Sequence, residues 1–208
     1  SASYTVSATN TGGTDTVALT IVVNDIAPSI SYSTTSFTLT NGTAMTTTSV
    51  TSTGGTVLSY SVSPSLPAGL SLDTSTGTLS GTPTEVTSSA SYTITATNTG
   101  GTDTASVTIT VNDIAPSITY STNSFTLTNG TAMTTATVTS TGGNVVSYSV
   151  SPSLPAGLSL DTTTGAISGT PTEVTSSASY TITATNTGGT DTASVTIVVN
   201  DIAPSISY

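Results

Sequence analysis

The sequence predicts an all-β protein built from tandem two-layer sandwiches, and three observations lead to this prediction. Threonine, which is β-branched and favours strands, dominates the polar residues, whereas Lys, Arg and Gln, which favour helices, are absent. Short segments alternate apolar residues with Ser or Thr, which is the period of a half-buried strand. The segment VNDIAPSI begins at Val23, Val111 and Val199, so the chain repeats every 88 residues.

The repeat sets the expected domain organisation. Two full repeats cover residues 26–113 and 114–201, and they differ at ten positions, nearly all of them conservative. Residues 1–25 match the C-terminal part of a repeat, and residues 202–208 match its first strand. We therefore expect the chain to be a window on a longer tandem array.

Within a repeat, the early strand signals come in short segments. Alternation at 30–32 and 37–39 predicts a first strand in two parts. Residues 47–53 and 57–63 flank Gly54-Gly55, which predicts a hairpin. Leu70 and Leu72 lead through an expected turn at 73–77 into a short strand at 78–80.

The last two strands of the repeat give the clearest signal. Apolar residues alternate over 92–96 and 105–111, and Asn98–Gly101 supplies the turn between them. About seven short strands per repeat, with regularly spaced turns, predict a Greek-key sandwich of immunoglobulin type. One face of each sheet is expected to be aliphatic and the other to carry Thr and Ser.

Composition excludes most functional classes. The chain has no Lys, Arg, His or Cys and a formal net charge of −10. Histidine bases, Cys-His or Ser-His nucleophile systems and lysine Schiff bases are therefore excluded, and we expect no enzyme activity. Without cations the chain is expected to bind neither nucleic acid nor anionic membranes, and without a long apolar run it has no membrane-inserting segment.

Particular residues carry a family resemblance. They are the segment SLPAGLSLD at 65–73, Thr76-Gly77, LSGTP at 79–83, YTITATN at 92–98 and VTITVND at 107–113, with counterparts at 154–171 and 180–201. This pattern resembles the bacterial and archaeal putative-Ig repeat, a family related to the cadherin-like domain of dystroglycan type. The resemblance implies an extracellular, cadherin-like β-sandwich found in long arrays of cell-surface proteins, without enzyme activity.

The relation to cadherins also implies a calcium site between domains. Glu85 lies near one cadherin ligand position, and Asn112 and Asp113 match the end of the cadherin linker motif, although Thr110 replaces its leading Asp and Asn98 replaces a further acidic ligand. The second repeat offers Glu173, Asn200 and Asp201. Calcium prefers six to eight oxygen ligands, several of them carboxylates. The alternative is that Asn112-Asp113 form an Asx-turn at the junction.

Other side chains have simpler interpretations. Asn41 and Asn129 lie in N-x-[ST] sequences, so each is either a glycosylation acceptor or part of an ordinary Asn-Gly turn. We expect Asp73 to cap its own turn and Asp103 to be solvated. Tyr32 and Tyr60 fit core or rim packing better than an exposed carbohydrate-stacking surface.

These observations favour a non-enzymatic structural module of a long extracellular repeat protein, either a cell-surface stalk or a secreted fibre. Its partners would be neighbouring repeats of the same chain and, in a filament, other copies. The alternative is a repetitive adhesin whose repeats bind glycans or a protein by avidity. A spacer within a larger secreted enzyme is a third interpretation. No cofactor is required, apart from the calcium that the resemblance implies.

Overall fold

The computed structural model describes residues 1–206, and these contain strands and turns but no helix. The chain divides into two compact units, each of which is described by itself. The first comprises residues 1–37, 44–83 and 89–110, and the second comprises residues 38–43, 84–88 and the chain from 111 onward. The prediction of an all-β fold is confirmed.

The first full repeat forms two facing layers of short strands. One layer has the strand order β4-β10-β9-β6. The other contains the pairs β3-β5 and β7-β8, joined by a bridge between Thr48 and Leu79. The strands are β3 (Pro28–Tyr32), β4 (Ser36–Thr40), β5 (Val50–Gly54), β6 (Ser59–Ser63), β7 (Leu70–Leu72), β8 (Leu79–Gly81), β9 (Thr87–Asn98) and β10 (Gly101–Asn112).

The predicted hairpin around Gly54-Gly55 is wrong. Strand β5 pairs with β3, and β6 pairs with β9, so Gly54 ends β5 and Gly55 begins a connection between the layers. The reason is steric: a Cβ at Gly54 would lie 2.4 Å from the Ala27 carbonyl oxygen, and one at Gly55 would lie 2.2 Å from that of Ile26. The glycines therefore allow a close approach of backbone rather than a hairpin turn.

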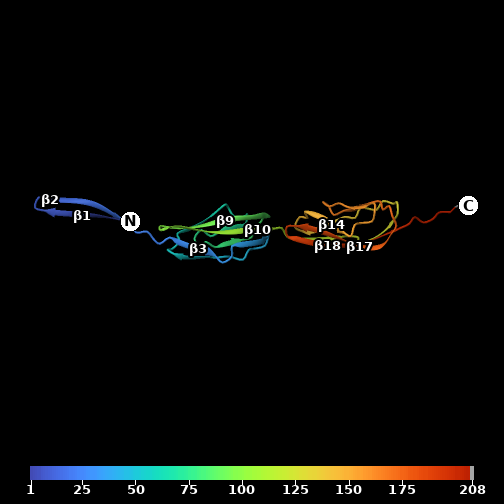
Figure 1. Ribbon diagram of the computed structural model, residues 1–208, viewed down its shortest axis with the longest axis horizontal. Helices are drawn as coiled ribbons and strands as arrows, with labels where there is room; N and C mark the ends of the chain where they lie inside the picture. The colour runs from blue at the N-terminus through green and yellow to red at the C-terminus, as the bar shows by residue number, and fades with distance from the viewer. Residues whose placement is uncertain (207–208) are drawn as a thin grey trace. The chain divides into compact units, whose positions relative to one another are not determined.

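The second full repeat has the same topology. Strand β12 pairs in parallel with β18, β18 with β17, and β17 with β14, while β11 pairs with β13 and β15 with β16. Figure 1 shows β14, β17 and β18 close together. The strands are β11 (Pro116–Tyr120), β12 (Ser124–Thr128), β13 (Val138–Gly142), β14 (Ser147–Ser151), β15 (Leu158–Leu160), β16 (Ile167–Gly169), β17 (Thr175–Asn186) and β18 (Gly189–Asn200).

Each sandwich buries one face of its long hairpin. Along β9 and β10 buried side chains alternate with more exposed Ser and Thr, as the sequence predicted. The inward aliphatic side chains of the first repeat are 0–1% exposed. Those at the corresponding positions of the second repeat are equally buried and belong to that repeat's own core. The fully buried aliphatic positions are Ile94, Ala96, Val107, Ile109 and Val111 in the first repeat and Ile182, Ala184, Val195, Ile197 and Val199 in the second.

The N-terminal segment forms a separate hairpin of β1 (Ala2–Asn10) and β2 (Gly13–Ile21). Figure 1 shows its two strands running side by side. All its residues are exposed, including Tyr4, Val6 and Leu19, at 52%, 53% and 48%. At the other end, residues 202–206 form no strand; the first strand predicted at 202–208 falls partly on residues 207–208, outside the described residues.

Candidate functional site

The most organised polar cluster of the first repeat lies where the β9–β10 turn (Asn98–Gly101) meets the linker (Asp25–Ala27). The side-chain amide of Asn98 donates to the Ile26 carbonyl oxygen at 2.7 Å, and its Oδ1 accepts from the N–H groups of Gly100 and Gly101 at 2.8 and 3.1 Å. The N–H of Asp25 donates to Thr99 Oγ1 at 3.2 Å. Asn98 is only 7% exposed, so its hydrogen bonds replace those it would make with water.

Close packing accompanies these hydrogen bonds. A Cβ at Gly100 would lie 2.0 Å from the Asp25 carbonyl oxygen and 2.7 Å from the Ala27 nitrogen. Because real Cβ atoms never approach backbone so closely, only glycine leaves room for the linker at this position. The turn and the linker therefore fit each other as two stretches of backbone.

The second repeat builds the same cluster from the β17–β18 turn (Asn186–Gly189) and the second linker (Asp113–Ala115). The Asn186 amide donates to the Ile114 carbonyl oxygen at 2.7 Å, and the N–H of Asp113 donates to Thr187 Oγ1 at 3.0 Å. Gly188 would meet the Asp113 carbonyl oxygen at 2.1 Å if it carried a Cβ. The duplicate geometry indicates that the sequence of the repeat specifies this contact.

Asp103 belongs to the same cluster, and the prediction that it is merely solvated is wrong. Its Oδ2 accepts from the Ile30 N–H at 2.7 Å, and Asp191 accepts from the Ile118 N–H at the same distance. Since the chain has no cationic side chain, the main-chain N–H groups near the linker supply the donors that this carboxylate needs.

The residues of the predicted calcium site have other contacts here. The Asp113 carboxylate accepts from the N–H groups of Ile114 and Asn144 at 2.8 and 3.1 Å, so its local bond reaches the next residue rather than forming the expected Asx-turn. Glu173 accepts from Ala156 N–H at 3.4 Å, and Asp201 from Ile202 N–H at 2.8 Å. Glu85 is exposed, Asn112 ends β10 and Asn200 ends β18.

Among residues 1–206 no group of three or more Asp, Glu, His or Cys side chains is placed to hold a metal ion. Calcium also binds amide and main-chain oxygens, which such a group does not include. The calcium site at Glu85, Asn112 and Asp113, and its counterpart in the second repeat, therefore stay predictions.

Both predicted glycosylation positions lie at corresponding turns. The main-chain N–H of Asn41 donates to the Asn112 carbonyl oxygen, and that of Asn129 to the Asn200 carbonyl oxygen, each at 2.8 Å. Each Asn is partly exposed, and the glycine that follows has a positive φ near 75°, as an Asn-Gly turn requires. Glycosylation at Asn41 and Asn129 stays a prediction.

Two tyrosines tie one layer of each sandwich to a turn. Tyr32 and Tyr60 are each 6% exposed, which confirms core packing, and the Tyr32 hydroxyl donates to the Gly77 carbonyl oxygen. Burial, with a smaller contribution from Tyr60, raises the pKa of Tyr32 to about 12. Tyr120 makes the corresponding bond to Gly165.

Asp73 caps its own turn, as predicted. Its Oδ1 accepts from Ser75 Oγ, Ser75 N–H and Thr76 N–H at 2.6, 2.8 and 3.1 Å. These hydrogen bonds, led by that of the Ser75 hydroxyl, lower the pKa of Asp73 to about 2. Oδ1 of the carboxylate thus accepts three hydrogen bonds within the turn, and a structural role accounts for this residue.

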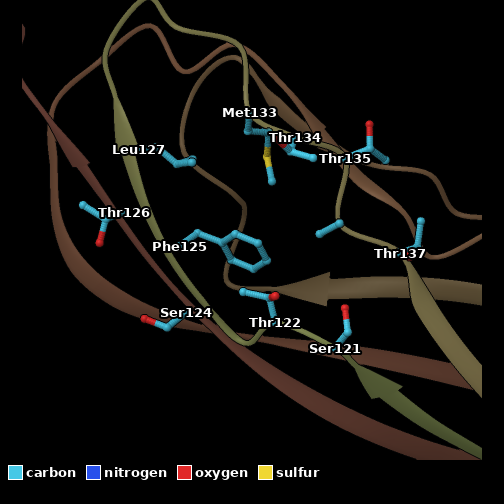
Figure 2. A pocket seen from close by; sticks show the side chains of 11 residues that line it. Ser121, Thr122, Ser124, Phe125, Thr126, Leu127, Met133, Thr134, Thr135 and Thr137 are labelled. Carbon is cyan, nitrogen blue, oxygen red and sulfur yellow. The ribbon is translucent and has the colours of Figure 1, made fainter.

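A groove of about 420 Å³ lies beside β12 in the second repeat. Figure 2 shows the Phe125 ring and the Met133 side chain pointing toward each other into it, with Ser and Thr hydroxyls around them. Its lining residues include no carboxylate, amide or cationic side chain. The groove therefore offers apolar contact and hydroxyl hydrogen bonds, and its lining includes no general base that could activate a hydroxyl as a nucleophile.

The role of the β9–β10 turn in holding the linker does not follow from the sequence pattern alone. By pattern, Asn98 only departs from a calcium ligand position, and Gly100-Gly101 only form part of a hairpin turn. The signal that identifies the contact is the combination of two Gly-Gly pairs, at 54–55 and 100–101, in a repeat whose linker must pass between them. Such close approaches require glycine without any catalytic purpose.

Three solved structures are similar to this chain, and the first of them, with a TM-score above 0.5, agrees with an Ig-like fold. A Dscam1 fragment, the N-terminal four Ig domains of isoform 9.44, is 15% identical with a TM-score of 0.52, covering 91% of this chain and 51% of that one. The titin I67–I69 E-to-A variant is 16% identical with a TM-score of 0.49 (97% and 74%), and human protocadherin-24 EC1-2 is 18% identical with a TM-score of 0.38 (87% and 100%).

No curated protein has a sequence that matches this chain. Within residues 1–206, no helix of the length and apolarity that a membrane span needs is found. The model of the family described as Putative Ig domain matches residues 27–112 and again residues 115–200, which together make up most of the chain. The chain therefore belongs to the Putative Ig domain family and carries two of its domains in tandem.

Proposed function

We propose that this chain is part of a non-enzymatic extracellular stalk or filament, in which Ig-like domains repeat head to tail and act as spacers. One observation carries the proposal: the two domains share the hydrogen bonds of the Asn98 and Asn186 clusters and the Asp103 and Asp191 contacts. A binding specialisation would be expected to diversify exposed loops. Here the ten differences are scattered and nearly all conservative.

The force response of the chain tests this function. A spacer must hold a load, and antiparallel and parallel ladders across β4, β9 and β10 resist separation of a domain's ends as one cooperative unit. We expect single-molecule stretching of the chain to give two unfolding events. Each would add roughly 300 Å of contour length, from an 88-residue repeat at about 3.5 Å per residue. Gradual extension without discrete events would contradict a mechanical role.

The groove at Phe125 favours adhesion as a second candidate function. An aromatic ring beside Ser and Thr hydroxyls combines an apolar contact with hydrogen-bond partners, and weak sites repeated along an array gain strength by avidity. A glycan-array screen of the chain and of Phe125→Ala tests it. Binding that Phe125→Ala abolishes supports adhesion, and the absence of any bound glycan contradicts a glycan-binding repeat.

A further inference from the structure

Each full repeat contains one Asn-Gly pair, Asn41-Gly42 in the first and Asn129-Gly130 in the second. The two pairs lie in segments of identical sequence, because residues 36–47 and residues 124–135 both read SFTLTNGTAMTT. In an unfolded chain the two pairs therefore have the same neighbours and the same reactivity. Any difference between them in the folded protein must come from the structure around them.

The two turns share most of their geometry. In each, the N–H of the threonine after the glycine donates to the carbonyl oxygen of the threonine before the asparagine, at 3.0 Å. The φ angles of Gly42 and Gly130 are 75° and 73°. Both glycines are exposed, and a Cβ built on either would meet nothing within 4 Å. Water and small reagents therefore reach both pairs equally well.

One hydrogen bond distinguishes the two pairs. The Gly130 N–H donates to the Pro171 carbonyl oxygen at 2.9 Å. Within residues 1–206, no group accepts a hydrogen bond from the Gly42 N–H. The main-chain nitrogen of Gly130 is thus held by another loop of its own domain, whereas the nitrogen of Gly42 is not.

That nitrogen is the nucleophile when an Asn-Gly pair modifies itself. It gives up its proton and attacks Cγ of the preceding Asn side chain; the new N–C bond closes a succinimide ring, and the side-chain nitrogen leaves with the proton as ammonia. Water then opens the ring to aspartate or isoaspartate. The chain has no Lys or Cys, so no side-chain amine or thiol competes with water. A hydrogen bond from the glycine N–H must break before the attack, so it slows ring closure.

We propose that Asn41 is a site of spontaneous succinimide formation, and that the hydrogen bond from Gly130 to Pro171 protects Asn129, whose local sequence is the same. Either product adds a carboxylate directly after β4, and isoaspartate also lengthens the main chain by one methylene group. Both products remove the side-chain amide that glycosylation of Asn41 would need. The inference goes beyond the spacer function and does not depend on it.

Cleavage of the full chain by hydroxylamine tests the difference between the pairs. Hydroxylamine attacks the succinimide and releases the glycine amino group, so the chain is cut wherever the ring forms. A cut after Asn41 gives residues 1–41 and 42–208, and a cut after Asn129 gives residues 1–129 and 130–208, which mass spectrometry distinguishes. In native buffer we expect the cut after Asn41 to be about two- to tenfold faster, the factor that corresponds to one hydrogen bond.

The same reaction in denaturant is the matched control. There the two rates are expected to become equal, because the two segments have the same sequence. Asn41→Gln and Asn129→Gln assign the two cuts, since glutamine would have to close a larger ring. Hydrogen exchange gives a second measurement without any reagent: the Gly42 N–H is expected to exchange faster than the Gly130 N–H in the folded chain.

Several results would overturn the proposal. In native buffer they are equal cutting at the two pairs, faster cutting after Asn129, or no cutting at all. A difference that persists in denaturant would assign the effect to something other than the fold, and equal exchange of the two glycine amides would remove the hydrogen bond as its cause. None of these results bears on unfolding under force, so the spacer function is tested separately.

Discussion

The N-terminal hairpin and the long hairpin of the first repeat have nearly the same sequence and opposite environments. Residues 1–25 and 89–113 align without gaps, yet Val6 is 53% exposed while Ile94 at the same position is fully buried. Leu19 and Val107 differ in the same way, at 48% and 1%. Residues 1–25 match only the last two strands of a repeat, and the burial of those strands in the full repeats comes from the other strands of the sandwich.

The largest expected effect tests this difference in burial directly. Ile94→Ala should lower the free energy of unfolding of the first repeat by about 2–5 kcal/mol, because it removes buried carbon atoms and leaves a cavity. Val6→Ala should change stability by no more than about 0.5 kcal/mol, because its side chain is exposed. Urea unfolding of the full chain measures both, with the unaltered second repeat as internal reference. Equal losses would contradict the comparison.

Alkaline pH should cause the second-largest loss in the free energy of unfolding of the full repeats. The pKa of Tyr32 rises from 10.0 in the unfolded chain to about 12 in the folded domain, so its stabilising contribution is complete below pH 10 and is lost as pH rises toward 12. Two pKa units correspond to at most about 3 kcal/mol, and solvent screening of this partly buried hydroxyl reduces the expected loss to about 2 kcal/mol. Chemical unfolding at pH 9, 10, 11 and 12 measures this loss of stability.

The matched control for the alkaline effect is Tyr32→Phe, which keeps the ring and removes the hydroxyl. It should lower stability at pH 9, because the bond to the Gly77 carbonyl is lost, and should flatten the decline of the first repeat above pH 10. The second repeat keeps Tyr120 and should still lose stability. An equally steep decline in the first repeat of the variant would assign the effect to another group.

A smaller effect is expected when alanine replaces the corresponding glycines of the β9–β10 and β1–β2 turns. Gly100→Ala should destabilise the first repeat by about 1–3 kcal/mol, because its Cβ would overlap the Asp25 carbonyl oxygen. Gly12→Ala should be nearly neutral, because its Cβ would meet only the movable Asn10 side chain, at 3.2 Å. Thermal unfolding of both variants checks this. A similar cost at both positions would mean that the turn itself, and not the linker, requires glycine.

The smallest effect concerns the turn of Asp73, in which the carboxylate accepts hydrogen bonds from residues of the turn itself. The pKa of Asp73 is lowered to about 2 by hydrogen bonds within its own exposed turn, so its contribution to stability is present above about pH 4 and is lost as pH falls through 2. Carbon-detected NMR titration of Asp73 measures this pKa. Ser75→Ala should raise it, because the hydroxyl bond is removed, and an unchanged pKa would contradict that cause.

The sequence predicted the parts of the fold that depend on short-range pattern. Alternation located β9 and β10, and Asp73 marked the β7–β8 turn, because strand period and turn chemistry act over a few residues. Gly54-Gly55 was misassigned because a glycine pair satisfies a hairpin turn and a close backbone approach equally well. The role of Asp103 was missed for a related reason: its partner, the Ile30 N–H, lies 73 residues away.

The capture of the linker has a consequence for the order of events during synthesis. Asp113 leaves the ribosome 74 residues before Thr187, which binds its N–H. A growing chain therefore carries each linker uncaptured until almost the whole of the following domain has been made. Because the turns Asn98–Gly101 and Asn186–Gly189 are identical, and so are the linkers, affinity does not distinguish the correct pair from one shifted by a repeat. Proximity along the chain and the timing of synthesis must make that choice.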